Sequence, residues 1–215
     1  MILFSEGAEP DKNEDAVDVR QLFRGGRGWI GAIADGQGGH PGGARAAQLA
    51  CEAALENLGA ASAEQAASPT FWQELFRAVD GRVTHDSEAG LANLLAFVLT
   101  GDHVYGASCG DSAASLLTGG GSEEAQVLDL TAHQVKDPQI GSGETACTFF
   151  SAPLVEPWAL LVMTDGVWKY AKRGRIADLL KHARGDEFSA QLEALGRLPG
   201  SGTFQDDFTF ALVES

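Results

Sequence analysis

Basic residues and long hydrophobic runs are scarce in this sequence of 215 residues. It contains 15 Lys and Arg against 30 Asp and Glu, which gives a formal net charge of −15. Because such a field repels phosphate backbones and anionic lipids, we expect neither nucleic acid nor a membrane as a partner. No stretch approaches the roughly 18 apolar residues of a membrane span, and no basic segment precedes the short apolar start, so neither export nor anchoring is expected.

Cysteine is also rare. Cys51, Cys109 and Cys147 are odd in number and form no CxxC pair, which argues against a disulfide framework and against a zinc knuckle. A reducing, cytoplasmic location is therefore expected. With 44% hydrophobic and 21% charged residues, the chain has the composition of a soluble globular protein, and its length fits a single domain over residues 1–215.

The first part of the chain predicts a hairpin followed by two helices. Residues 16–23 alternate loosely and residues 29–34 (WIGAIA) form a short apolar run, with GGRG between them as the turn. Residues 44–58 are rich in Ala and Leu, and residues 69–83 carry apolar side chains at helical spacing. We therefore expect a β-hairpin and then two amphipathic helices.

From Leu94 onward, short apolar runs alternate with turn signals and predict a β-meander. Its strands are expected at residues 94–100, 103–109, 113–118 and 126–130. Later segments predict strands at 145–150, 158–163 and 208–213, and helices at 174–182 and 188–198. This order of elements is typical of an α+β layered sandwich and not of a doubly wound parallel sheet.

Aspartates stand at the ends of four predicted core strands: Asp35, Asp111, Asp165 and Asp206. In an antiparallel sheet, the end of one strand and the start of its neighbour share an edge, so Asp165 and Asp206 can face one another. Asp35 can join them from a facing strand. A strand that ends in Asp-Gly is also a common turn, but turns alone give no reason for an acid at each of these ends.

Carboxylates gathered at the rim of an apolar core repel one another and lose hydration. Either their pKa values rise or cations lie between them. Oxygen ligands without His or Cys suit Mg²⁺ or Mn²⁺ better than zinc. Two such ions can activate a water molecule and position a phosphate for in-line attack. The acid pattern therefore favours phosphoryl chemistry.

Five short segments resemble the motifs of the metal-dependent protein phosphatases of the PPM, or type 2C, family. They occur in the family's order and span nearly the whole chain, which makes the resemblance specific although each motif alone is weak. The segments are NEDA at residues 13–16, ADGQGGH at 34–40, GDS at 110–112, TDGVW at 164–168 and DDFT at 206–209.

This resemblance implies a four-layer α-β-β-α sandwich, with two antiparallel sheets flanked by helices and two Mn²⁺ or Mg²⁺ ions at one edge. It implies that Asp35 bridges both ions and that the backbone carbonyl of Gly36 binds the first. Asp165 and Asp206 then bind the second ion. Asp35, Asp165 and Asp206 are accordingly the catalytic residues that the resemblance assigns.

Two further acids enter the site by the same resemblance. Glu14 would reach the first ion through water, and Asp111 with Asp165 would hold a weaker third ion. Whether two or three ions bind is left open by the sequence.

The sequence also departs from the family pattern. The Arg that usually grips the substrate phosphate is Pro10 here, with Lys12 as a substitute that offers a point charge instead of a bidentate fork. Leu91 and Ala92 replace two threonines of a Gly-Thr-Thr segment. Only about a dozen residues separate His133 from Thr145, where members commonly carry a longer flap, so we expect a shortened flap.

The resemblance implies a phosphatase that hydrolyses phosphoserine or phosphothreonine on a protein, by metal-activated water, in opposition to a Ser/Thr kinase. We expect it to be a monomer. Two alternatives stay open. One is a phosphatase-like domain that binds metal or a partner with little or no turnover, and the other is a phosphatase of a small phosphorylated metabolite.

Overall fold

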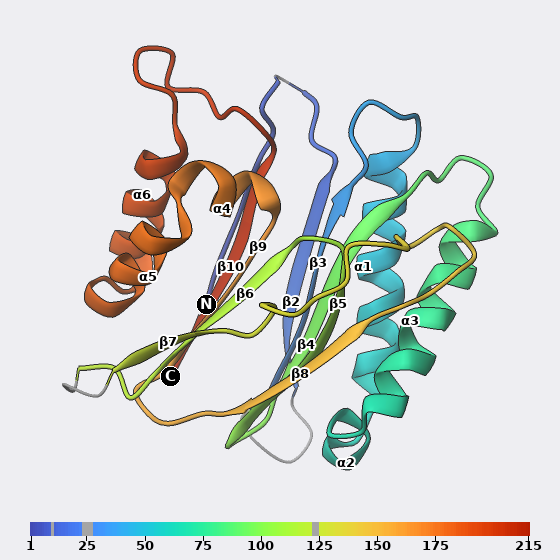
Figure 1. Ribbon diagram of the computed structural model, residues 1–215, viewed down its shortest axis with the longest axis horizontal. Helices are drawn as coiled ribbons and strands as arrows, with labels where there is room; N and C mark the ends of the chain where they lie inside the picture. Colours follow the sequence, from blue (N-terminus) through green and yellow to red (C-terminus); the bar gives the residue numbers. More distant parts are fainter. Residues whose placement is uncertain (10, 23–27, 122–124) are drawn as a thin grey trace.

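Two five-stranded antiparallel sheets, with helices on both outer faces, make up the structure (Figure 1). The structure is a computed structural model that describes residues 1–9, 11–22, 28–121 and 125–215. It confirms the expected α+β sandwich of four layers. The first sheet has the order β2-β3-β4-β5-β8, with β2 Asp15–Leu22, β3 Gly28–Gly36, β4 Ala92–Leu99, β5 His103–Cys109 and β8 Thr148–Pro153. The second has the order β1-β10-β9-β6-β7, with β1 Ile2–Glu6, β10 Phe208–Glu214, β9 Ala159–Met163, β6 Ala113–Thr118 and β7 Gln126–Asp129.

The predicted hairpin is the β2–β3 pair, whose register aligns Asp15 with Asp35. The turn predicted at GGRG, residues 25–28, lies largely outside the described residues. The prediction of a single β-meander was wrong, because its strands divide between the two sheets. Strand β5 pairs with β4, whereas β6 pairs with β7 and β9. The chain crosses from one sheet to the other at Gly110 and Asp111, between β5 and β6.

The helices cover the sheets in two groups. Helices α1 (Gly43–Ala60) and α3 (Pro69–Thr84) pack on the first sheet, while α4 (Asp165–Ala171), α5 (Arg173–His182) and α6 (Gly185–Gly196) pack on the second (Figure 1). Short α2 (Ala63–Ala66) lies in the connection between α1 and α3, and a capping box at Ser62 begins this helix. None of the described helices combines the length and the hydropathy that a bilayer span requires.

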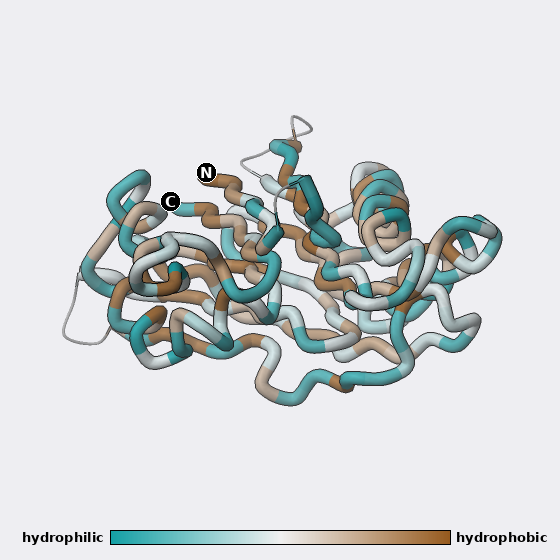
Figure 2. The backbone as a smooth tube through the Cα atoms, turned by 90° about the horizontal axis from the view of Figure 1, so that it is seen from above, coloured by the Kyte–Doolittle hydropathy of each residue, from teal (hydrophilic) through white to brown (hydrophobic). Residues whose placement is uncertain are grey.

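Alternation along the strands separates three apolar layers. In β4, Leu94, Ala96 and Val98 face the helices, whereas Leu95, Phe97 and Leu99 face the other sheet. Figure 2 shows hydrophobic segments along the strands and hydrophilic ones along many of the connecting loops. The packed layers leave the strand ends, and not the strand centres, as the place for polar chemistry.

Phe97 lies between two glycines in the layer that joins the sheets. Its register partners are Gly31 on β3 and Gly106 on β5. A Cβ atom added at Gly31 would overlap the Phe97 ring. Because Phe97 is fully buried, its ring has little room to move, and the missing side chain at position 31 is what admits it.

Gly31→Ala should lower the free energy of unfolding by about 1–3 kcal/mol, since the added methyl group overpacks the layer between the sheets. Urea denaturation measures the change. Gly59→Ala in α1 is the matched control, because a Cβ there comes no closer than 4.0 Å to Ile30 and alanine favours the helix. Equal stability of wild-type protein and Gly31→Ala would contradict this packing.

Candidate metal centre

The first pair of acids comes from the β2–β3 hairpin. Asp15 begins β2 and lies directly opposite Asp35 near the end of β3. Beyond Asp35, the Gly36 amide donates to the backbone carbonyl of Glu14 at 3.0 Å. A Cβ at Gly36 would overlap the backbone of Gly43, so glycine is required for this close approach. The hairpin thus brings Asp15, Asp35 and the backbone of Glu14 to one end of the first sheet.

The second pair comes from neighbouring strands of the other sheet. Asp165 follows β9 and begins α4, and Asp206 lies just before β10, which is the antiparallel partner of β9. The expected juxtaposition of these two strand ends is therefore present in the fold. Asp165 was predicted at the end of a strand, and it is also the first residue of α4, a helix that sequence analysis did not predict.

Three of the predicted acids converge closely. Single carboxylate oxygens of Asp35, Asp111 and Asp165 all lie within 4.8 Å of one another, and we call these residues the aspartate trio. They come from the end of β3, the β5–β6 crossing and the start of α4. Asp206 is outside the trio, but its charge raises the pKa of Asp35, and the charge of Asp165 raises the pKa of Asp206.

Burial and mutual repulsion perturb these acids strongly. Burial, followed by the charges of Asp15, Asp165, Asp111 and Asp206, raises the pKa of Asp35 to about 9. Burial also raises the pKa of Asp15 to about 7, although hydrogen bonds from threonines oppose the rise. Burial and the charge of Asp165 raise the pKa of Asp206. Without a cation, the centre therefore holds protons that ordinary carboxyl groups release.

A threonine links the two sheets at this end. Thr164, fully buried before α4, donates its hydroxyl to Asp15 Oδ2 at 2.9 Å, and its Oγ1 accepts the amide of Thr209 at 3.3 Å. Asp15 belongs to the first sheet and both threonines to the second. This contact fixes the distance between the two groups of acids.

Asp207 holds the N-terminal segment against β10. Its Oδ1 accepts the Ala8 amide at 2.9 Å and its Oδ2 accepts the Glu14 amide at 2.6 Å. Both carboxylate oxygens of Asp207 therefore accept backbone amides. Glu14 is placed by its backbone, and its carboxylate lies 3.7 Å from the Lys12 ammonium group.

Sequence reasoning missed three side chains that contact the trio. Lys136 lies 3.0 Å from Asp111 Oδ2, and Asn93 Nδ2 donates to Asp111 Oδ1 at 2.7 Å. Lys169 contacts Asp165 Oδ2 from one turn further along α4. The i,i+4 spacing of Asp165 and Lys169 could have indicated this pair, but only if α4 had been predicted.

The donor set fits hard divalent cations. The trio offers carboxylate oxygens alone, without histidine or cysteine, which is the chemistry of Mg²⁺ and Mn²⁺ sites. When ionised, Asp35 is the least compensated acid of the trio, since none of the hydrogen bonds among the described residues ends on its carboxylate. Asp35 is therefore the residue that gains most from a bound cation.

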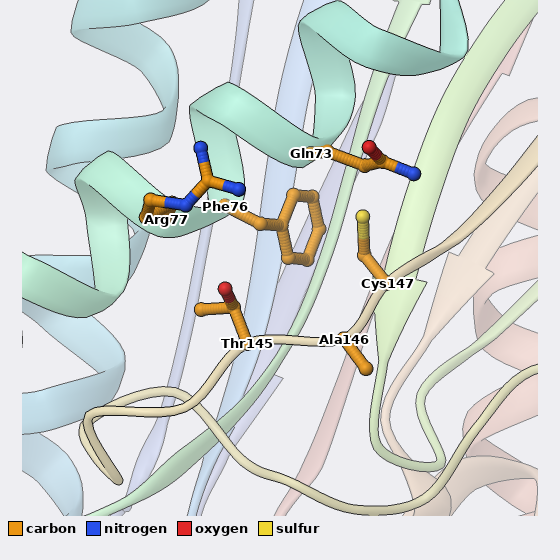
Figure 3. A pocket seen from close by; sticks show the side chains of 6 residues that line it. All are labelled: Gln73, Phe76, Arg77, Thr145, Ala146 and Cys147. Atoms are coloured by element: carbon orange, nitrogen blue, oxygen red, sulfur yellow. The ribbon is translucent and has the colours of Figure 1, made fainter.

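A separate hollow of about 300 Å³ lies between α3 and the segment that leads into β8 (Figure 3). Phe76 and Cys147 are among its lining residues, and Figure 3 shows the Cys147 sulfur directed toward α3. Burial raises the pKa of the Cys147 thiol to about 11. Since a nucleophilic cysteine needs a lowered pKa, this hollow offers no nucleophile to compete with the metal centre.

Comparison with known proteins confirms the family resemblance. Residues 8–196 match the family model of protein phosphatase 2C. No curated protein matches the chain.

Solved structures share the fold at low sequence identity. A bacterial serine phosphatase superposes with a TM-score of 0.81 at 19% identity, over 99% of this chain and 96% of that one. The serine/threonine phosphatase Stp1 from Staphylococcus aureus gives 0.81 at 18%, over 100% and 94%. The catalytic domain of the serine threonine protein phosphatase PstP, in complex with two manganese ions, gives 0.76 at 19%, over 99% and 96%.

Without divalent ions, the protein should lose thermal stability as the pH rises. The pKa of Asp35 is 3.8 in the unfolded reference and about 9 in the native state. Between these values the native state binds more protons than the unfolded state, so the free energy of unfolding falls with increasing pH. Melting curves in chelator from about pH 5 to about pH 9 should show this fall.

Asp35→Asn should make that fall shallower, because asparagine does not titrate, and Mn²⁺ should stabilise the wild-type protein most at high pH. A melting temperature that rises over this range in chelator, or an equally steep fall in Asp35→Asn, would contradict the raised pKa of Asp35.

Proposed function

The chain belongs to the protein phosphatase 2C family, and on that premise we propose that it hydrolyses phosphoserine and phosphothreonine on a protein substrate, with Mn²⁺ or Mg²⁺. One observation carries the proposal: Asp35, Asp111 and Asp165, from three distant segments, place carboxylate oxygens within 4.8 Å of one another. An arrangement of three half-buried acids is costly unless it binds a cation. Its presence at one end of the sandwich therefore supports a metal-dependent function.

We assign the ions to the acids as follows. Asp35 would be a ligand of both ions; the Gly36 carbonyl and, through water, Glu14 would help to hold the first, and Asp165 and Asp206 would hold the second. Asp111 is the remaining acid of the trio. When bound, such ions supply an activated water as nucleophile and neutralise the oxygens of a phosphate group.

The chain's own residues position these acids and attract the substrate. Gly36 allows the backbone at the end of β3 to lie against Gly43, and Asp207 holds the amide of Glu14 in place. Lys12 keeps 56% of its side chain exposed while its ammonium group is 3.7 Å from Glu14. We assign Lys12 to attracting the substrate phosphate, since Pro10, at the position of the usual Arg, has no charge.

The proposed unit of function is one domain over residues 1–215 with a short flap.

The connection between β7 and β8 is held at its centre by hydrogen bonds. Ile140 forms a backbone bridge with Ala92, and buried Asp80 of α3 accepts the amides of Gly141 at 2.8 Å and Gly143 at 3.3 Å. Such a connection offers substrates a nearly fixed surface. A cytoplasmic monomer that opposes a Ser/Thr kinase completes the proposal.

Two alternative functions have specific support. Pro10 in place of Arg and the ammonium groups beside Asp111 and Asp165 favour a domain that binds metal or a partner with little turnover. The short flap favours a small phosphorylated metabolite as substrate, because little of the chain is left to select a protein. Each alternative predicts a different result in the same assays.

Wild-type protein should hydrolyse p-nitrophenyl phosphate and a phosphothreonine peptide in Mn²⁺, and chelator should abolish both activities. Asp35→Asn should lower kcat at least about 100-fold, because it removes the shared ligand of both ions. Asp18→Asn is the matched control, since Asp18 lies on the same strand as Asp15 but pairs with Arg20.

Equal rates for wild type and Asp35→Asn would refute catalysis at this centre. Mn²⁺-dependent stabilisation without phosphate release from any substrate would instead establish the non-catalytic alternative. A rate on phosphorylated metabolites far above that on peptides would establish the metabolite phosphatase.

A further inference from the structure

Two lysines lie against one side of the aspartate trio. The Lys136 ammonium group is 3.0 Å from Asp111 Oδ2, and the Lys169 ammonium group contacts Asp165 Oδ2. Lys136 belongs to the connection between β7 and β8, and Lys169 belongs to α4. Two unrelated segments thus bring positive charge to the same pair of acids.

Asp111 has both of its carboxylate oxygens engaged by protein donors. Asn93 occupies Oδ1 at 2.7 Å and Lys136 occupies Oδ2 at 3.0 Å. Asn93 is itself buried and its Oδ1 accepts Gln139 Nε2 at 2.9 Å, so it cannot turn away without losing a second hydrogen bond. A cation that used Asp111 would have to displace at least one of these donors.

The two sides of the acidic centre therefore differ in charge. Asp111 and Asp165 each face an ammonium group, whereas the Asp35 carboxylate accepts no hydrogen bond from the described residues. Of the four acids whose charges act on Asp35, Asp111 and Asp165 are paired with lysines, whereas Asp15 and Asp206 form no ion pair with a lysine or arginine among the described residues. The need for a divalent ion is thus concentrated around Asp35 and away from the Asp111 carboxylate.

We propose that Lys136 and Lys169 take the place of a third divalent ion between Asp111 and Asp165, so that the protein binds two divalent ions and not three. This inference rests on the proposed function, because it concerns ions at that same centre. Asp111 is then the counter-ion of Lys136 and not a ligand of a divalent ion.

Tethering gives the lysines an advantage over a weakly bound free ion. A side chain held beside its partner acts at an effective concentration of about millimolar or more. The position of Lys169 one helical turn after Asp165 fixes that distance. Trp168 adds rigidity, because its Nε1 donates to the Asp111 carbonyl at 2.9 Å while its ring lies 5.8 Å from the Lys169 ammonium group.

Elemental analysis and calorimetric titration with Mn²⁺ alone test the proposal without any substrate. Wild-type protein should bind two Mn²⁺ per chain, and Lys136→Ala/Lys169→Ala should bind three. Lys136→Arg/Lys169→Arg keeps the charge and should bind two. Lys181→Ala is the matched control, since Lys181 is an exposed lysine of α5, and it should also bind two.

Lys136→Ala alone guards against a double variant that fails to fold, because 71% of the Lys136 side chain is exposed. It should bind a third Mn²⁺ at higher free concentration than the double variant. Three ions in the wild-type protein, or two in both alanine variants, would overturn the proposal while leaving the proposed function intact. No Mn²⁺ bound to the wild-type protein would overturn both.

Discussion

Mutual repulsion among carboxylates at one end of the sandwich is the constraint on which the rest of the structure depends. Four layers pack through apolar side chains, but Asp15 and Asp35 from one sheet and Asp165 and Asp206 from the other meet where these layers stop. Burial, together with this repulsion, raises the pKa of Asp35 to about 9, so its carboxyl group retains a proton at neutral pH. The fold must hold these acids together against their charge, and it does so with contacts that do not consume the Asp35 oxygens.

Those contacts are made by neighbours of the proposed ligands. Thr164 precedes Asp165 and bonds Asp15 across the two sheets, while Asp207 follows Asp206 and accepts two amides of the N-terminal segment. Each positioning residue is thus adjacent in sequence to an acid that it serves. In each adjacent pair, one side chain makes the structural contact while the other is a proposed metal ligand.

The strand ends could be predicted from the sequence, but the connections between them could not. Asp165 and Asp206 were placed together because neighbouring antiparallel strands share an edge. Strand β1 escaped prediction because its partner is β10, at the opposite end of the sequence, and a five-residue strand carries little local signal. Helix α4 escaped because Asp165-Gly166 also has the pattern of a turn. Lys136 could not be placed beside Asp111, since its position depends on the path of an irregular connection held by Asp80 and Asn93.

The whole chain is strongly negative, whereas lysines lie beside the acidic centre. This difference in charge affects how an anionic substrate would approach. A net charge of −15 repels a phosphorylated protein, but salt screens much of this repulsion at separations beyond about 8–10 Å. Within that distance, Lys12, Lys136 and Lys169 surround the acids, and each keeps at least 41% of its side chain exposed. Attraction of a phosphate is therefore local, and it depends on these lysines together with whatever ions the acids hold. Lys136 and Lys169, which take the place of a third ion in our proposal, thus also supply positive charge beside the acids where a phosphate would bind.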